Sequence, residues 1–261
     1  MLVWVLCLAG LGVRGVIHQI SAFGEISGLT SPHHSPNETL FLFDLDNTLM
    51  TPSTDVGSDQ WFYCLYQAAG IAPLANEEVD SKLVRIWNEV QHKIVVEPTE
   101  PELAGWIRSH QELGYRTMAL TARSFNMLDV SIKQLDSIGI RLHGLNSAAA
   151  GDGVGEDLIL AKELLGGREE ARFSRGVLAV GESNVKATAL QVFLRHHHQQ
   201  RTGIRKIVFV DDKHYHCEAM DQITLDNVVI ESYRYGKLDE RVSKFQCDQQ
   251  EAARHFLLSA A

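Results

Sequence analysis

Two aspartates, Asp44 and Asp46, lie two residues apart just after a short apolar segment. The segment Thr39–Phe43 (TLFLF) is typical of a buried strand, and the aspartates follow it in Asp44-Leu45-Asp46-Asn47-Thr48. Because side chains alternate along an extended chain, the two carboxylates face the same way. Their like charges repel, and a bound divalent cation relieves that repulsion while keeping a carboxylate ionised for nucleophilic attack.

Further polar side chains follow three later apolar segments. Thr121 and Arg123 come after one of them, Lys186 begins the helical segment after the next, and Asp211 and Asp212 follow the last. Hydroxyl, guanidinium and ammonium groups suit phosphoryl oxygens, and carboxylates are the ligands that magnesium prefers. Each group alone also has an ordinary explanation as turn chemistry, a helix cap or an exposed lysine. Together, and in this order, they predict one phosphate and metal site.

The elements that must position these residues alternate along the chain. Strands are predicted at 39–43, 115–120, 177–180, 206–210 and 227–230. Helices are predicted at 58–69, 76–93, 99–114, 125–138, 184–198, from the end of the fourth strand to 223, and at 240–258. This order predicts an α/β fold, a three-layer parallel sheet with helices on both faces. Ligands of such sheets bind beyond the carboxyl ends of the strands, where the polar residues lie.

The segment between the first and second strands is predicted to contain a helical cap and the start of a further helix. The helical pair at 58–69 and 76–93 has no strand of its own, which predicts a small helical cap inserted at about 51–98. Its aromatic residues are more often core than substrate platform, although some side chains of a cap can face the pocket. Thr99 and Glu102 fit a capping box that begins the helix ending near Gly114.

These motifs resemble those of the haloacid dehalogenase (HAD) superfamily, of the phosphatase type. The segment Phe43–Leu49 (FDLDNTL) resembles its first motif, DxDxT, and Leu120–Arg123 (LTAR) its second. Lys186 is similar to the third motif and Val210–Asp212 (VDD) to the fourth. The resemblance covers about residues 39–230 and implies a HAD-like Rossmannoid core with a small C1 cap. LTARS followed by VDDK is also similar to a poorly characterised bacterial HAD-like family, DUF2608.

The resemblance implies a role for each residue of the site. Asp44 is the expected nucleophile, which attacks phosphorus to form an aspartyl-phosphate. Asp46 protonates the leaving oxygen and then deprotonates the hydrolytic water. Thr121 and Lys186 hold phosphoryl oxygens and offset their charge, and Arg123 is a further candidate for substrate binding.

A magnesium ion, Mg2+, is the cofactor that the resemblance implies. Asp211, the Asp44 carboxylate and the Asp46 carbonyl are its expected ligands, and Asp212 is a further ligand or supports one. Lys213 is an alternative to Lys186 for the third motif. We favour Lys186 because it begins a helix directly after a strand.

The expected function is a magnesium-dependent phosphomonoester hydrolase that acts on a small phosphorylated substrate. Two alternatives stay open: a HAD-like binding or effector module without significant turnover, and a phosphotransferase that uses an acceptor other than water. The chain has 24 lysines and arginines and 33 acidic residues, so its net charge is −9, and the basic surface of a general nucleic-acid binder is not expected. The sequence leaves the oligomeric state and the substrate open.

The N-terminus resembles a signal peptide. Leu2–Val13 is an apolar run too short to span a membrane, with no basic residue before it. We expect a leader at 1–22, a linker at 23–38 and the core domain at 39–261, and hence export to the periplasm or out of the cell. The alternative is a buried N-terminal strand or helix in a cytoplasmic protein. Cleavage would remove one of four cysteines and leave at most one disulfide and a thiol.

One further motif, His214-Tyr215-His216, carries two histidines on the helix after the fourth strand. No third ligand accompanies them, so a zinc site is not indicated. We expect the two histidines to serve local packing or substrate contact.

Overall fold

The computed structural model describes residues 16–26, 35–69, 77–145, 157–166, 170–181, 185–198 and 203–258. Its centre is an eight-stranded sheet with the order β1-β10-β9-β2-β5-β8-β7-β6. In that order the strands are β1 (His18–Ile20), β10 (Val229–Tyr235), β9 (Lys206–Asp211), β2 (Thr39–Phe43), β5 (Arg116–Thr121), β8 (Val177–Ala179), β7 (Ala171–Ser174) and β6 (Leu158–Leu160). The first six in this order run parallel, and the last two are antiparallel to their neighbours.

The prediction of a parallel α/β sheet is therefore confirmed for the part that carries the candidate site and is wrong for the β7–β6 edge. The strands β7 and β8 are joined by a two-residue turn, Arg175-Gly176, in which φ is 46° and 79°. A turn with two positive φ values connects antiparallel strands, because its twist matches theirs. A parallel connection would need a crossover of a dozen or more residues.

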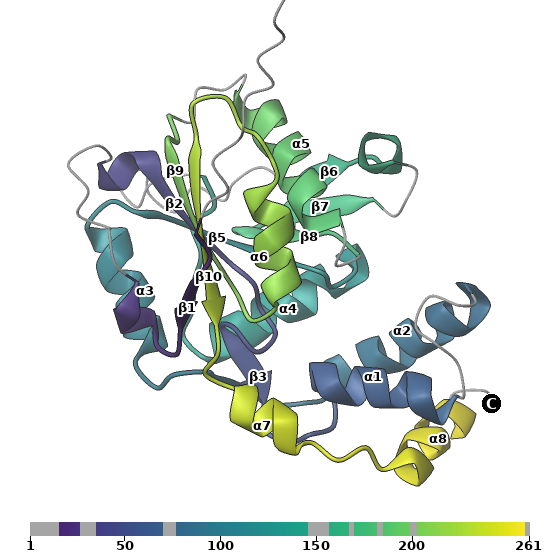
Figure 1. Ribbon diagram of the computed structural model, residues 1–261. Helices are drawn as coiled ribbons and strands as arrows, with labels where there is room; N and C mark the ends of the chain where they lie inside the picture. Colours follow the sequence, from purple (N-terminus) through teal and green to yellow (C-terminus); the bar gives the residue numbers. More distant parts are fainter. Residues whose placement is uncertain are drawn as a thin grey trace, which may run out of the picture.

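Helices cover both faces of the sheet, as expected for a three-layer arrangement. On one face lie α3 (Leu103–Glu112) and α4 (Leu128–Ser137), and on the other lie α5 (Lys186–His198) and α6 (His214–Asp221). Figure 1 shows α3 on the opposite side of the sheet from α5 and α6. The fully buried strand β2 serves both layers, because its alternate side chains enter the two separate clusters of the core.

The predicted cap is a separate layer of three helices. A two-stranded antiparallel ribbon, β3 (Met50–Pro52) with β4 (Val96–Pro98), leads into and out of α1 (Asp59–Ala68) and α2 (Glu77–Gln91). The third helix is α8 (Gln249–Leu258), which packs against α1 and α2 although it comes from the C-terminus. Figure 1 shows α8 beside α1 at the end of the molecule away from β6.

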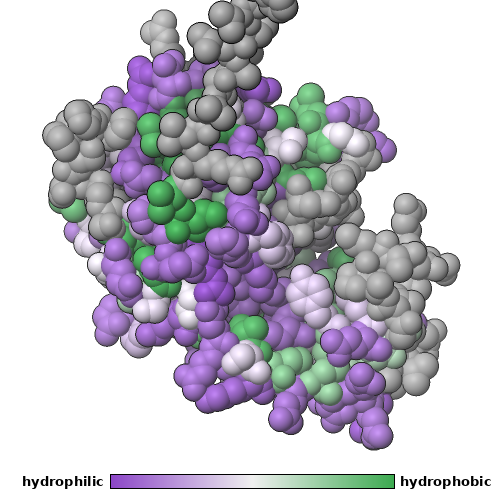
Figure 2. Space-filling view, viewed as in Figure 1, coloured by the Kyte–Doolittle hydropathy of each residue, from purple (hydrophilic) through white to green (hydrophobic). Residues whose placement is uncertain are grey.

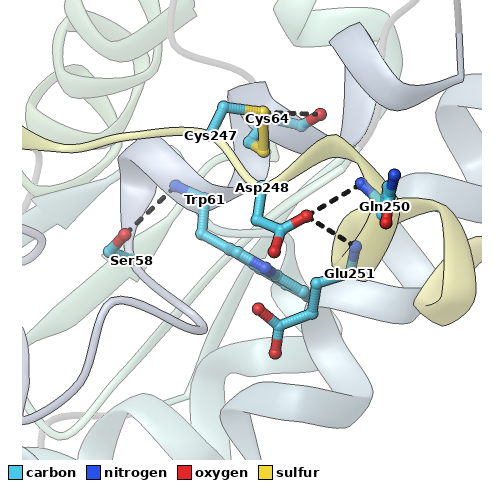
Figure 3. Close-up of a disulfide and its surroundings, with 7 residues drawn as sticks. All are labelled: Ser58, Trp61, Cys64, Cys247, Asp248, Gln250 and Glu251. Carbon is cyan, nitrogen blue, oxygen red and sulfur yellow. Dashed lines mark hydrogen bonds between the residues drawn. A yellow bond between two sulfur atoms is a disulfide. The ribbon is translucent and has the colours of Figure 1, made fainter.

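The helix expected at 240–258 is in fact two helices, α7 (Asp239–Lys244) and α8, separated by an extended segment. Within that segment Cys247 forms a disulfide with Cys64 of α1, 183 residues away in the sequence (Figure 3). The Asp248 carboxylate then accepts hydrogen bonds from the backbone N–H groups of Gln250 and Glu251, at 2.9 and 3.0 Å. This side chain caps a new helix, so the chain restarts α8 against α1.

The capping box expected at Thr99 and Glu102 does not form. Helix α3 begins at Leu103, and no side chain caps its N-terminus. The Thr99 hydroxyl instead donates to the Thr48 carbonyl at 2.6 Å. This bond joins the end of β4 to the loop after β2, so Thr99 helps to hold that loop in place.

The N-terminal boundaries also differ from those expected. Residues 1–15 and 27–34, which hold most of the expected leader and linker, lie outside the described residues. His18–Ile20 forms the edge strand β1, paired with β10, and Phe23 and Ile26 are buried in the core. Cleavage after Ala22 would remove β1 from the sheet, so the folded domain includes residues that were assigned to the leader and linker.

Short 3-10 turns complete the fold at η1 (Phe23–Glu25), η2 (Pro36–Glu38), η3 (Phe125–Met127) and η5 (Lys162–Leu165). No helix among the described residues is long and apolar enough to cross a membrane. The face seen in Figure 2 is largely hydrophilic, with apolar residues in separate patches.

Candidate functional site

The candidate site lies where three neighbouring parallel strands end. The strands β9, β2 and β5 are adjacent in the sheet, so the residues that follow them meet at one edge. The backbone N–H of Asp44 continues the pairing and donates to the Val210 carbonyl at 2.9 Å. The backbone N–H of Asp212 donates to Thr48 Oγ1 at 3.0 Å. The loops after β2 and β9 are therefore fixed to each other.

The loop after β2, which carries Asp46, turns sharply at Asn47. Asn47 has φ of 60°, in the left-handed region that asparagine tolerates better than most residues. Its N–H donates to the Met50 carbonyl at 2.8 Å, and the N–H of Met50 donates to the Leu45 carbonyl at 3.0 Å. The motif around the two aspartates is therefore a closed, hydrogen-bonded turn.

Three of the predicted metal ligands form a buried cluster. Asp44, Asp211 and Asp212 each offer a ligand atom, and these atoms lie within 4.8 Å of one another. Among the described residues, Asp46 contributes no side-chain oxygen to this cluster. Asp44 and Asp211 also share one cation, because Lys186 Nζ lies 2.5 Å from Asp44 Oδ1 and 2.9 Å from Asp211 Oδ2. Carboxylate oxygens of this kind are ligands for hard divalent cations.

Burial sets the charge of these carboxyl groups. It raises the pKa of Asp44 well above its usual range, although Lys186 acts in the opposite direction. Burial also raises the pKa of Asp212 to about 7, against the lowering effect of Lys213. For Asp211, burial alone would raise the pKa, but Lys186 and His216 bring it below the usual value. A cation beside the cluster would favour the ionised form of all three.

The two lysines considered for the third motif have different surroundings. Lys186 begins α5 and is buried against Asp44 and Asp211. Lys213 instead lies 2.9 Å from Asp212 Oδ2 and 2.7 Å from Asp59 Oδ2 at the start of the cap helix α1. The structure thus places Lys186 beside the expected nucleophile, whereas Lys213 connects the carboxylate cluster to the cap.

His216 belongs to the site, which the sequence did not distinguish from local packing. Its Nδ1 lies 2.9 Å from both oxygens of Asp211, so a proton on Nδ1 is donated to that carboxylate. Its Nε2 is buried and has no hydrogen-bond partner among the described residues. Burial lowers the His216 pKa, and the nearby Lys186 lowers it further. The sequence signal that could have identified His216 is its position, in the first turn of the helix that follows β9.

Arg123 binds Asp46, whereas it was expected as a candidate for substrate binding. Its Nε and Nη2 donate to the two Asp46 oxygens at 2.8 and 2.7 Å. Nη1 donates to Ser131 Oγ and Gln134 Oε1 at 3.1 and 2.6 Å, and Nη2 also donates to Gln91 Oε1 at 3.2 Å. These bonds use all five N–H donors of the guanidinium. In this arrangement no Arg123 donor is left for a phosphoryl oxygen.

Thr121 lies where expected, buried at the end of β5. Its Oγ1 accepts a hydrogen bond from the backbone N–H of Arg123 at 3.2 Å. The same hydroxyl can donate its own proton, so Thr121 has a donor for a phosphoryl oxygen. It lines the same cavity as Asp44 and Lys186.

A cavity of about 230 Å³ lies between the strand ends and the cap. Its floor includes Asp44, Thr121, Lys186 and His216, and its opposite wall consists of cap side chains, among them Phe62. The site therefore combines buried carboxyl groups, cationic and hydroxyl groups and a partly open cavity of small-molecule size.

Comparison with known proteins gives one finding. No curated protein matches the chain. The family model described as a protein of unknown function (DUF2608) matches residues 19–258, from within β1 to the end of α8. This range includes the sheet, the site and the cap, and the weaker of the two resemblances seen in the sequence is confirmed. The chain belongs to the DUF2608 family.

Proposed function

We propose that the protein is a magnesium-dependent phosphomonoester hydrolase of the HAD type. The observation that carries this proposal is the position of Asp44 at the floor of the cavity, beside Lys186 and two further buried aspartates. A nucleophile, a charge-neutralising cation and a metal-binding cluster around one small cavity are the parts that phosphoryl transfer requires.

In the proposed reaction, a carboxylate oxygen of Asp44 attacks phosphorus, and the bond from phosphorus to the leaving alcohol breaks. Asp46, once a proton replaces part of its pairing with Arg123, gives that proton to the leaving oxygen, so that an alcohol departs and an aspartyl-phosphate remains. Asp46 then takes a proton from water as the water oxygen attacks phosphorus. Inorganic phosphate leaves and Asp44 is restored as a carboxylate. Lys186 and Thr121 offset the charge on the phosphoryl oxygens.

Magnesium fits the residues that surround Asp44. Asp44, Asp211 and Asp212 would hold it together with the Asp46 carbonyl, and a bound ion supplies charge neutralisation and orientation of the phosphoryl group. The raised pKa values of Asp44 and Asp212 support this assignment, because buried acids of this kind ionise readily only beside a cation. Asp211 already has hydrogen-bond donors that position it for a ligand role.

The test is release of inorganic phosphate from a broad panel of phosphate esters, with magnesium and with a chelator. We expect turnover that depends on magnesium, that is abolished in Asp44→Asn, and that falls strongly in Asp46→Asn. Thermal unfolding of both variants separates loss of chemistry from loss of fold. Full activity of Asp44→Asn would contradict the nucleophile assignment.

Two outcomes of the same experiment would favour the alternatives. Absence of turnover across the panel, by a folded protein that binds magnesium, would indicate a binding or effector module. Phosphorylated alcohols formed when alcohols are added to the reaction would indicate phosphotransfer, because the same intermediate would then pass its phosphoryl group to an acceptor other than water.

We also propose that the protein is exported. The Cys64–Cys247 disulfide supports this, because disulfides persist mainly in oxidising compartments. A leader would have to end before His18 to leave β1 in the sheet. The N-terminal residue of the exported protein, determined by mass spectrometry, tests both points, and a mature chain beginning at Met1 would contradict cleavage.

A further inference from the structure

The cap side of the cavity is a wall of aromatic rings. Phe62, Tyr63 and Tyr66 come from α1 and Trp87 comes from α2, and all four line the cavity. The ring centroids of Phe62 and Tyr66 are 5.2 Å apart and those of Phe62 and Trp87 are 5.8 Å apart, in edge-to-face arrangements. These rings lie opposite the phosphate-binding side chains, so they face the leaving group of a bound ester.

An aromatic cluster is by itself the ordinary filling of a helical cap, and Trp61 and Leu65 of α1 serve in that way. Three unpaired polar atoms of residues that line the cavity set this site apart. The indole nitrogen of Trp87, Oδ1 of Asn88 and Oγ of Ser124 are buried, and none has a hydrogen-bond partner among the described residues. All three residues line the cavity.

Unpaired buried polar atoms are costly, and a ligand that satisfies them recovers part of that free energy on binding. The Trp87 indole only donates, an amide oxygen such as Asn88 Oδ1 only accepts, and the Ser124 hydroxyl does both. A complementary ligand therefore carries an acceptor and a donor. It must also present an apolar face to Phe62 and Tyr66.

A planar ring with polar atoms on its edge meets these demands. Its face packs against the aromatic side chains, and its edge pairs with the indole N–H and the amide oxygen. The hydroxyls of a sugar or glycerol group can also pair with these polar atoms, but such a group offers the aromatic side chains a smaller flat apolar face than a planar ring does. The cavity volume of about 230 Å³ limits the size of the leaving group.

We propose that the substrate is a phosphomonoester whose leaving group carries a planar heteroaromatic ring, held between the cap aromatics with its edge on Trp87 and Asn88. This inference rests on the proposed phosphatase function and adds the class of its leaving group. Nucleotides and phosphorylated pyridines share this chemistry.

The first test compares kcat/KM for esters of primary alcohols, so that the leaving oxygens are chemically matched. Nucleoside 5′-monophosphates and pyridoxal 5′-phosphate are the ring-bearing arms, and glycerol 3-phosphate, glucose 6-phosphate and phosphoserine are the arms without a heteroaromatic ring. We expect a preference of about 10-fold or more for a ring-bearing arm, the effect of one recovered hydrogen bond of about 1.4 kcal/mol. Comparison of the two ring-bearing arms shows whether a nucleotide or a phosphorylated pyridine is preferred.

The second test changes the wall. Trp87→Phe keeps a ring and removes the indole N–H, so the preference for ring-bearing esters should fall by about 10-fold. Trp61→Phe is the matched control, because Trp61 is in the same cap core and does not line the cavity. An equal change of the preference in the two variants would overturn the proposed role of Trp87.

Binding gives a readout that does not depend on turnover. In Asp44→Asn with magnesium, calorimetry should show tighter binding of the preferred ring-bearing ester than of glycerol 3-phosphate. Equal hydrolysis of ring-bearing and other esters overturns this inference and leaves the hydrolase intact. Absence of hydrolysis of every ester overturns the proposed function, and equal binding in the variant then overturns the inference separately.

Discussion

Arg123 and Asp46 form a bidentate ion pair, with Nε 2.8 Å and Nη2 2.7 Å from the two carboxylate oxygens. Arg123 is buried, and its remaining donors reach Gln134 of α4 and Gln91 of the cap helix α2. Gln134 Nε2 also donates to the Gln91 carbonyl at 3.0 Å. The carboxyl group expected to act as acid and base is therefore positioned by a network that includes the cap.

We expect Arg123→Lys to lower kcat by about 10- to 100-fold with little change in KM. Lysine cannot reproduce the two parallel hydrogen bonds, and a shift of a catalytic group by about 1 Å can cost on the order of 100-fold. Steady-state kinetics with magnesium measure both parameters. A rise of KM with unchanged kcat would return Arg123 to substrate binding.

A second variant tests the contribution of the cap residue Gln91 to the position of Asp46. Gln91→Leu removes the cap residue that accepts from Arg123 while leaving the Arg123–Asp46 pair in place. The substitution also removes the hydrogen bonds of the Gln91 side chain with the Gly57 carbonyl and with Gln134 Nε2. Only the bond with Arg123 bears directly on Asp46, so we expect a smaller fall in kcat, of a few-fold, in keeping with about 1 kcal/mol for that bond. Thermal unfolding of each variant identifies any loss that comes from instability.

His216→Asn should weaken magnesium binding by about 10- to 100-fold, because a hydrogen-bond donor that orients a metal-ligating carboxylate is lost. The magnesium dependence of activity and calorimetric titration both measure this change. His214→Asn is the matched control, since His214 is on the same helix turn but is exposed and lies near Glu218. Equal effects of the two substitutions would exclude a specific role for His216.

Asp212 makes the metal-free protein sensitive to pH. Its pKa is raised from 3.8 to about 7 on folding, so the folded state keeps a proton that the unfolded state loses. Between these two values the unfolding free energy contributed by this group falls as pH rises, by about 1.4 kcal/mol for each pKa unit. Below pH 3.8 the contribution is complete, and above pH 7 it is lost.

The measurement is urea unfolding of the wild type and of Asp212→Asn in the presence of a chelator. The variant carries no titrating group at this position, so its stability relative to the wild type should increase from pH 4 to pH 7. Magnesium should reverse the trend in the wild type, because it binds the ionised cluster of the folded state. A difference that does not change with pH would contradict the raised pKa.

The Cys64–Cys247 disulfide should stabilise the cap. Replacing both cysteines by serine is expected to lower the unfolding free energy by about 2–4 kcal/mol, because the cross-link restricts the unfolded chain over a long loop. A reductant should produce the same loss in the wild type and no further loss in the double variant. The remaining cysteine, Cys217, is buried and its pKa is raised by burial, so it should resist thiol reagents until unfolding.

Much of the central sheet could be predicted because it depends on local patterns. The strand at 39–43 is reproduced at both ends, and those at 115–120, 177–180 and 206–210 agree to within a residue. Each is mainly apolar, with polar residues such as Arg116 and Lys206 near its start, as expected for a strand that is buried on both faces. Strand β10 extends to Tyr235, whereas the predicted strand ends at 230. The prediction ended too early because polar residues such as Glu231 and Arg234 interrupt the apolar pattern.

The strands of the central sheet that were missed are short and at its edges, and the short ribbon of β3 and β4 was missed as well. His18–Ile20 has three residues and pairs with 233–235, more than two hundred residues along the chain. The β6–β7 pair has three and four residues and begins after a segment of small residues. Such strands have little periodicity, and their formation depends on the sheet that is already present.

The sequence by itself determined which side chains stand at the ends of the strands, because a parallel α/β sheet brings these ends to one edge. Only the tertiary structure decided their partners: Arg123 on Asp46, Lys186 between Asp44 and Asp211, and His216 behind Asp211. It also decided that Cys64 pairs with Cys247 and that the C-terminal helix completes the cap. These contacts join residues far apart in the chain, and their geometry follows from packing in three dimensions that no local pattern encodes.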